Sequence, residues 1–117
     1  MCGRPITKKN SQRVVTIHGH TVILPSRAYT QYEADCLRQL NGIAPHIDCA
    51  VNLACVYFMP TRHRVDLANL IEATQDILKA AGVIVDDNKD IVASLDGSRV
   101  DYDREKPRVE IEITVKA

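Results

Sequence analysis

Residues 66–87 read DLANLIEATQDILKAAGVIVDD, and this stretch decides how the chain folds. Its apolar and small side chains recur at the i, i+3, i+4, i+7 spacing, at Leu67, Leu70, Ile71, Thr74, Ile77, Leu78 and Ala81. The spacing predicts an amphipathic helix that Gly82 ends. Three apolar residues then lead into a pair of aspartates, Asp86 and Asp87.

Acidic residues stand at both ends of this predicted helix, with Asp66 at its start and Asp86-Asp87 past its end. Aspartate is a favoured N-cap and tolerates turns, so capping and turn formation are one explanation. The TRHR sequence at 61–64 favours another, because arginine can hold a phosphate group while metal ions bind neighbouring aspartates. If the start and the exit of the helix fold toward each other, the two groups of carboxylates meet.

The remaining segments predict an α+β fold. The β-branched runs RVVTI and TVIL flank a His-Gly-His turn and indicate a hairpin, and a helix is expected from Ser26 to Asn41-Gly42. DCAVNLACVYFMP predicts a central strand, NKDIVASL a further strand, and RVEIEITV a half-buried final strand. The order is ββ-α-β-α-β-β, and we expect one small domain over residues 1–117 with a mixed sheet and two main helices.

Composition is that of an ordinary globular protein, with 45% apolar and 26% charged residues. No apolar run approaches the roughly 20 residues that span a bilayer, so we expect no membrane partner. Residues 1–10 lack the apolar core of a signal peptide, which predicts a cytoplasmic protein with reduced thiols. A zinc site is not expected, because the spacing of the ligands that can be imagined fits no common pattern; these are His46, Cys49, Cys55 and His63.

The formal net charge of zero conceals two halves of opposite sign. Residues 1–45 carry six Lys and Arg against two acidic residues, a surplus of +4. Residues 46–117 carry nine Lys and Arg against thirteen acidic residues, a net charge of −4. A total charge of zero would disfavour a polyanionic partner, but the basic surplus of residues 1–45 is compatible with one.

The stretch from Met59 to Asp87 resembles the RusA family of Holliday junction resolvases, which are small homodimeric α+β nucleases, many of phage or prophage origin. The family motif has basic residues, then Asp-x-Asp-Asn, a lysine one helical turn later and an Asp-Asp pair further along. RHRVDLAN supplies the basic residues, Asp66 and Asn69, and Asp86-Asp87 fall where the pair belongs. GRPITKKNSQR also resembles the N-terminal loop of the family, with Asn10 at the matching place.

Two residues depart from the motif, since Ala68 replaces its second aspartate and Glu72 its lysine. Glu72 follows Ala68 by four positions, so both lie on one side of a helix, about 5.4 Å apart. Helical side chains lean toward the N-terminus, which directs Glu72 back over Ala68 toward Asp66. Our hypothesis is that Glu72 supplies the carboxylate missing at position 68; the alternative is that Glu72 belongs to the solvated face.

The resemblance implies a metal-dependent site, a DNA-binding surface and a homodimer. The candidate catalytic and metal-binding residues are Asp66, Asp86, Asp87 and Glu72, which would bind Mg²⁺, with Mn²⁺ as an alternative, through hard oxygen ligands. The candidate DNA-binding residues are Lys8, Lys9, Asn10, Arg13, Arg62, Arg64 and Asn69. The implied partners are branched DNA, in the form of a four-way junction, and a second copy of the chain.

Three functions follow from this sequence, and the first is favoured. It is a Mg²⁺-dependent, structure-selective endodeoxyribonuclease that resolves four-way junctions by paired phosphodiester hydrolysis in DNA recombination and repair. The alternative is a junction-binding protein that has lost cleavage because Ala68 stands at the second aspartate. The third is an α+β interaction module whose aspartates are only caps and turns.

Overall fold

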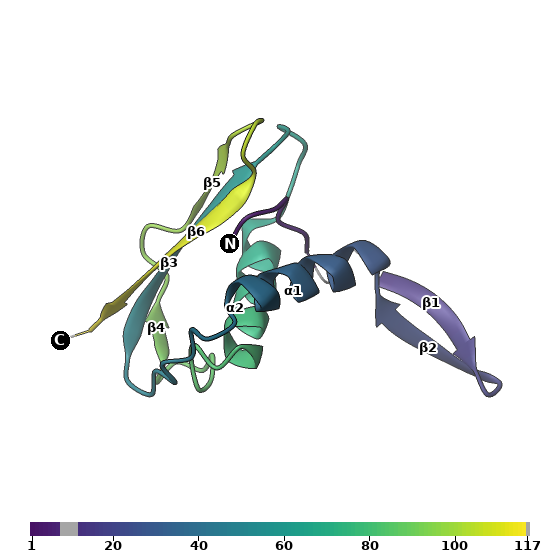
Figure 1. The fold of residues 1–117 in the computed structure, drawn as a ribbon, viewed down its shortest axis with the longest axis horizontal. Helices are drawn as coiled ribbons and strands as arrows, with labels where there is room; N and C mark the ends of the chain where they lie inside the picture. The colour runs from purple at the N-terminus through teal and green to yellow at the C-terminus, as the bar shows by residue number, and fades with distance from the viewer. Residues whose placement is uncertain (8–11, 117) are drawn as a thin grey trace.

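A computed structural model describes residues 1–7 and 12–116 of the chain (Figure 1). Its elements are β1 (Gln12–Ile17), β2 (His20–Pro25), α1 (Arg27–Gln39), β3 (Val51–Met59), α2 (Leu67–Ala80), β4 (Val92–Ser94), β5 (Arg99–Tyr102) and β6 (Arg108–Val115). This arrangement confirms the α+β fold, with two helices and a mixed sheet. The predicted order lacked β5, because all four residues of that short strand are exposed and show no alternation of buried and exposed positions.

Strand β3 is the centre of the main sheet. On one side β6 pairs antiparallel with it over eight residues, from Val51 opposite Val115 to Phe58 opposite Arg108. On the other side two short strands pair parallel, β4 with the beginning of β3 and β5 with its end. The two ends of β3 therefore have different neighbours, and each of them lies near one end of α2.

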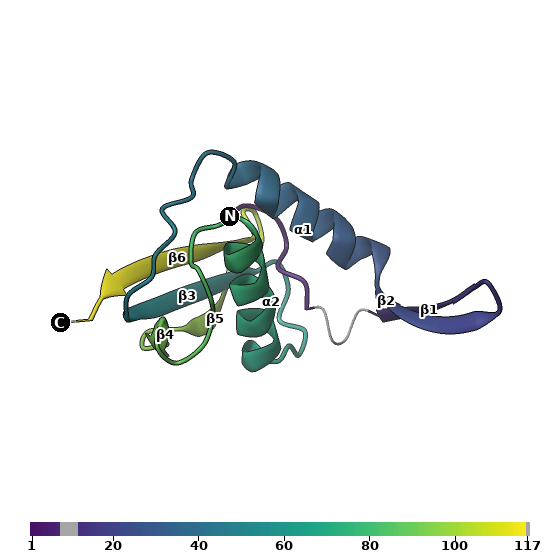
Figure 2. The same cartoon turned by 90° about the horizontal axis from the view of Figure 1, so that it is seen from below.

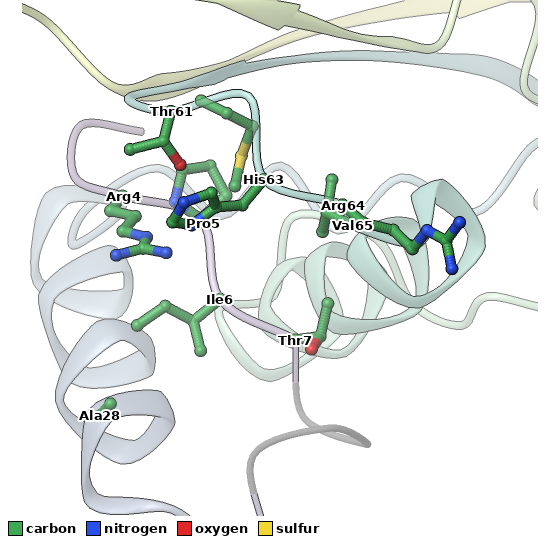
Figure 3. A pocket seen from close by; sticks show the side chains of 10 residues that line it. Arg4, Pro5, Ile6, Thr7, Ala28, Thr61, His63, Arg64 and Val65 are labelled. Atoms are coloured by element: carbon green, nitrogen blue, oxygen red, sulfur yellow. The ribbon is translucent and has the colours of Figure 1, made fainter. Parts of the chain in front are cut away.

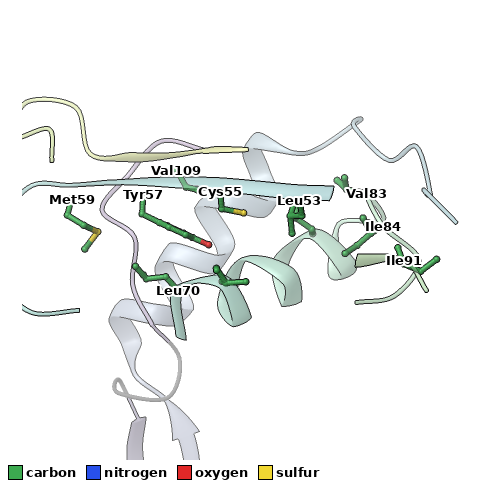
Figure 4. Close-up of a cluster of buried hydrophobic side chains, with 11 residues drawn as sticks. Leu53, Cys55, Tyr57, Met59, Leu70, Val83, Ile84, Ile91 and Val109 are labelled. Atoms are coloured by element: carbon green, nitrogen blue, oxygen red, sulfur yellow. The ribbon is translucent and has the colours of Figure 1, made fainter. Parts of the chain in front are cut away.

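Alternation along β3 directs every second side chain toward α2. Val51, Leu53, Cys55, Tyr57 and Met59 are buried, whereas the residues between them are half-buried. Of these, Leu53, Cys55, Tyr57 and Met59 pack against the apolar stripe of α2, which the sequence predicted (Figure 4). Helix α1 adds a second cluster, in which its buried residues contact the other side of α2; these are Tyr29, Tyr32 and Cys36 (Figure 2).

A buried hydrogen bond fixes the position of α2 along β3. The hydroxyl groups of Tyr57 and Thr74 are 2.7 Å apart, and Thr74 also donates to the carbonyl oxygen of Leu70 at 3.0 Å. Thr74 therefore accepts from Tyr57, and burial raises the pKa of the Tyr57 hydroxyl well above its usual range. Because an unsatisfied polar group in this core would be costly, the bond opposes sliding of the helix along the strand.

The chain leaves α2 through a tight turn at Gly82. Gly82 has a φ of 79°, and its N–H donates to the carbonyl of Lys79 while that of Val83 donates to Leu78. A Cβ atom at Gly82 would lie 2.9 Å from the ring of His46, so a side chain there would have to displace that ring and would also strain the backbone. Residues 83–85 then run beside Ile47, just before β3 begins, and so carry the chain toward the start of that strand.

The hairpin of β1 and β2 projects from the body beyond the beginning of α1 (Figures 1 and 2). Its register runs from Gln12 opposite Pro25 to Ile17 opposite His20, which confirms the predicted hairpin with both histidines at its turn. Among residues 1–7 and 12–116 no helix has the length and apolar character needed to cross a membrane.

Candidate active site

Asp66 lies between the end of β3 and the beginning of α2, where it caps the helix. Its Oδ1 atom accepts hydrogen bonds from the N–H groups of Ala68, at 2.9 Å, and Asn69, at 3.3 Å. This is the N-cap that the sequence offered as the simpler explanation. The cap leaves Oδ2 without a hydrogen bond from any described residue, so the same carboxylate can still bind a cation.

The pair Asp86-Asp87 lies at the opposite end of α2. The Nζ atom of Lys79, in the last turn of the helix, is 4.0 Å from Oδ1 of Asp86 and 3.7 Å from Oδ1 of Asp87. Asp86 also accepts from the N–H of Asp87 at 2.7 Å and from the Asn88 amide at 3.2 Å. The N–H of Asp87 is the main cause, with Lys79 a smaller one, that lowers the pKa of Asp86 and keeps it ionised at neutral pH.

The expectation that these acids meet within one chain is wrong. Helix α2 has 14 residues and is therefore about 21 Å long at 1.5 Å per residue. Asp66 caps one end, while Lys79 holds Asp86 and Asp87 at the other, and the turn at Gly82 does not return the chain along the helix. Among the described residues, no three His, Cys, Asp or Glu side chains come close enough together to hold a metal ion, the imagined zinc ligands included.

Glu72 and Ala68 lie on one exposed stripe of α2, as the spacing predicted, and Lys79 continues that stripe toward Asp86. The stripe joins the two acidic ends without bringing them together. Asn69 is half-buried at the first turn. Within a single chain the oxygen donors thus suit a hard divalent cation in kind but not in number, since at most two carboxylates share one end of the helix.

Cationic side chains gather near Asp66, at the end of β3. The guanidinium group of Arg62 lies over the ring of Tyr102, 4.5 Å from its centroid, which holds its charge at this edge of the sheet. Arg64 lines a hollow together with His63 and Arg4, which comes from the N-terminal segment (Figure 3). Of the other DNA-binding candidates, Lys8, Lys9 and Asn10 lie outside the described residues, as does the side chain of Arg13 in β1.

Arg4 and His63 were absent from the predicted DNA-binding set. Arg4 is 59 positions before His63, and only the folded chain shows that they line one space. In the sequence His63 stands out only as part of TRHR and as one of the four residues of the zinc site that is not expected. The one signal available in the sequence was the basic surplus of residues 1–45, which includes Arg4 but does not single it out.

A model of the family described as "Endodeoxyribonuclease RusA" matches residues 3–114 of the chain. The chain belongs to the RusA family. This match spans the hairpin, both helices and all strands of the main sheet except the last residue of β6. RusA nucleases are endodeoxyribonucleases that generally depend on a divalent metal, and the family suggests an enzyme that acts on Holliday junctions. A search of curated proteins found no match to the chain.

The observed cap at Asp66 and the metal-binding role predicted from the sequence can be separated by substitution. Asn caps a helix about as well as Asp, so Asp66→Asn should change the free energy of unfolding by only a few tenths of a kcal/mol, whereas Asp66→Ala should cost about 1 kcal/mol. Both variants lose the charge, and both should lose metal-dependent DNA nicking. Urea denaturation and a nicking assay provide the two readouts. If the Asn variant keeps full nicking activity, Asp66 is a cap and nothing more.

Proposed function

We propose that this RusA-family chain is a Mg²⁺-dependent endodeoxyribonuclease that resolves four-way DNA junctions by paired cuts, with Mn²⁺ as a possible substitute, and that residues 1–117 act as one domain. The observation that supports it most is that Asp66 lies near Arg4, His63 and Arg64, which form no ion pair with a described residue, at one end of α2, while Asp86-Asp87 occupy the other end. These are the positions of the acidic residues in the family motif.

A second copy of the chain would bring the separated acids together. If two copies place their α2 helices antiparallel about a two-fold axis, Asp66 of each copy comes beside Asp86 and Asp87 of the other. Two identical metal sites then form, each with acids from both chains. This arrangement suits a four-way junction, which has approximate two-fold symmetry and is resolved by cuts in two opposed strands.

At such a site the acidic residues and the lysine of each copy would have different functions. A divalent cation, when bound, supplies a nucleophilic water and stabilises charge on the phosphate. Asp66, Asp86 and Asp87 would hold it, and the N–H of Asp87 together with Lys79 lowers the pKa of Asp86, which keeps that carboxylate ionised at neutral pH. Lys79 lies on the same stripe as Glu72, so it is a candidate for the positive charge that the motif lysine would otherwise provide.

The proposed activity is tested by incubating the protein with a synthetic four-way junction and Mg²⁺. Asp87→Asn should lower the rate of nicking by roughly a hundredfold or more, because loss of a metal ligand removes several kcal/mol of transition-state stabilisation. Asp90→Asn is the matched control, since Asp90 is a nearby exposed acid paired with Lys89, and should cut normally. If both variants cut like the unaltered chain, Asp87 holds no catalytic metal.

The same assay separates the enzyme from the alternative, a junction-binding protein that cannot cut. The residue that favours this alternative is Ala68, which stands where the motif has an acid. Tight binding of the junction by the unaltered chain, with no nicks at any Mg²⁺ or Mn²⁺ concentration, would establish it.

Glu72 is proposed to replace the carboxylate missing at position 68. Glu72→Gln should then raise the Mg²⁺ concentration needed for half-maximal nicking and lower the maximal rate, because a metal ligand has lost its charge. Asp76→Asn, which removes the same charge from the next turn of α2, controls for a general change of charge on the helix. Undiminished nicking by Glu72→Gln at saturating Mg²⁺ would show that Glu72 is not a metal ligand and belongs only to the solvent-exposed face of the helix.

A further inference from the structure

A hollow of about 360 Å³ lies immediately before Asp66 in the fold. Three parts of the chain enclose it: the N-terminal segment 4–7, the first turn of α1 at Ala28, and residues 59–65 at the end of β3. Figure 3 shows the side chains of Arg4, Thr61 and His63 turned toward the same space, whereas the guanidinium group of Arg64 points away from them. The hollow therefore has its own set of hydrogen-bond donors, separate from the acids.

The charge of this hollow is positive and uncompensated. None of the described residues that line it is acidic, and neither Arg4 nor His63 forms an ion pair or hydrogen bond with another described residue. Arginine is always protonated and donates in a planar fork, histidine donates through at least one ring N–H, and Thr61 adds a hydroxyl. Such a set of donors, without an acceptor of its own, suits an oxyanion.

The walls and the position of the hollow narrow the class of anion. Apolar side chains complete the lining, chiefly Pro5, Ile6, Met59 and Val65. They suit the carbon atoms of a sugar that flanks a phosphate better than a small, fully hydrated ion. Because Val65 is in the wall and Asp66 follows it, the bound group would lie next to the proposed metal-binding carboxylate.

We infer that the hollow binds one backbone phosphodiester of the DNA strand, with Arg4 and His63 as its donors. The inference rests on the proposed function and deepens it. Arg4 and His63 are then positioning residues, which hold the strand so that a neighbouring phosphodiester faces Asp66. Contact with phosphate carries no base preference, so the effect of these residues is the same for every DNA sequence.

The first test measures binding of a synthetic four-way junction in EDTA, where no cutting occurs, over a range of salt concentrations. Arg4→Ala and His63→Ala should each bind about tenfold more weakly. Because one phosphate contact is lost, the negative slope of the logarithm of the association constant against the logarithm of the salt concentration should become less steep by about 0.9 in Arg4→Ala. Arg4→Lys should recover part of the affinity. Arg38→Ala is the matched control, because Arg38 is an exposed arginine on α1 that pairs with Asp35, and it should change neither quantity.

The second test uses dimethyl phosphate as the probe and does not depend on cutting or on junctions. Its addition should shift the ring signals of His63 in the NMR spectrum but not those of His18, His20 or His46, and Arg4→Ala should abolish the shift. Unchanged His63 signals, together with unchanged junction affinity of both Ala variants, overturn the inference even if the chain cuts junctions. Shifted signals in a chain that cuts no junction leave the phosphate site standing and remove the proposed function.

Discussion

The packing of one helix on one strand determines where the acidic residues of the family motif lie in this protein. Helix α2 lies on β3, and the Tyr57–Thr74 hydrogen bond inside the core opposes sliding between them. Asp66 and Asp86-Asp87 are consequently held at opposite ends of about 21 Å of helix. Rotation of side chains does not close such a distance, and the backbone hydrogen bonds of Val83 and Val85 with Ile47 hold the segment after Gly82 away from the beginning of the helix.

This constraint changes how the family motif is understood in this chain. The two acidic parts of the motif lie at opposite ends of α2 in one copy of the fold, so in the proposed function each would supply only half of a cation site. The Asp66 half carries the uncompensated cations that suit DNA, and the Asp86-Asp87 half carries Lys79. A two-fold pair of chains would join unlike halves twice, which is the simplest arrangement that gives complete sites and two cuts.

Much of the fold could be predicted from the sequence, because burial of one face gives α2, β3 and β6 a periodic pattern of apolar residues. Strand β5 could not be predicted, because its four residues are exposed and are held by pairing with β3 and not by burial. The N-cap at Asp66 was also foreseeable from local chemistry. The direction of the chain after Gly82 was not, because periodicity records which face is buried but not where the next segment goes. Arg4 was missed for a related reason, as its neighbour His63 is distant in sequence.

The most direct test of this account is to mix two inactive variants. Asp66→Asn and Asp87→Asn should each cut four-way junctions very poorly alone. After mixing and refolding together, about half of the dimers pair one of each, and each mixed dimer has one intact site, so about a quarter of the normal nicking rate should return. The product should be nicked on one strand, without paired cuts. If the mixture stays as inactive as its components, the acids act within one chain, and the shared site is contradicted.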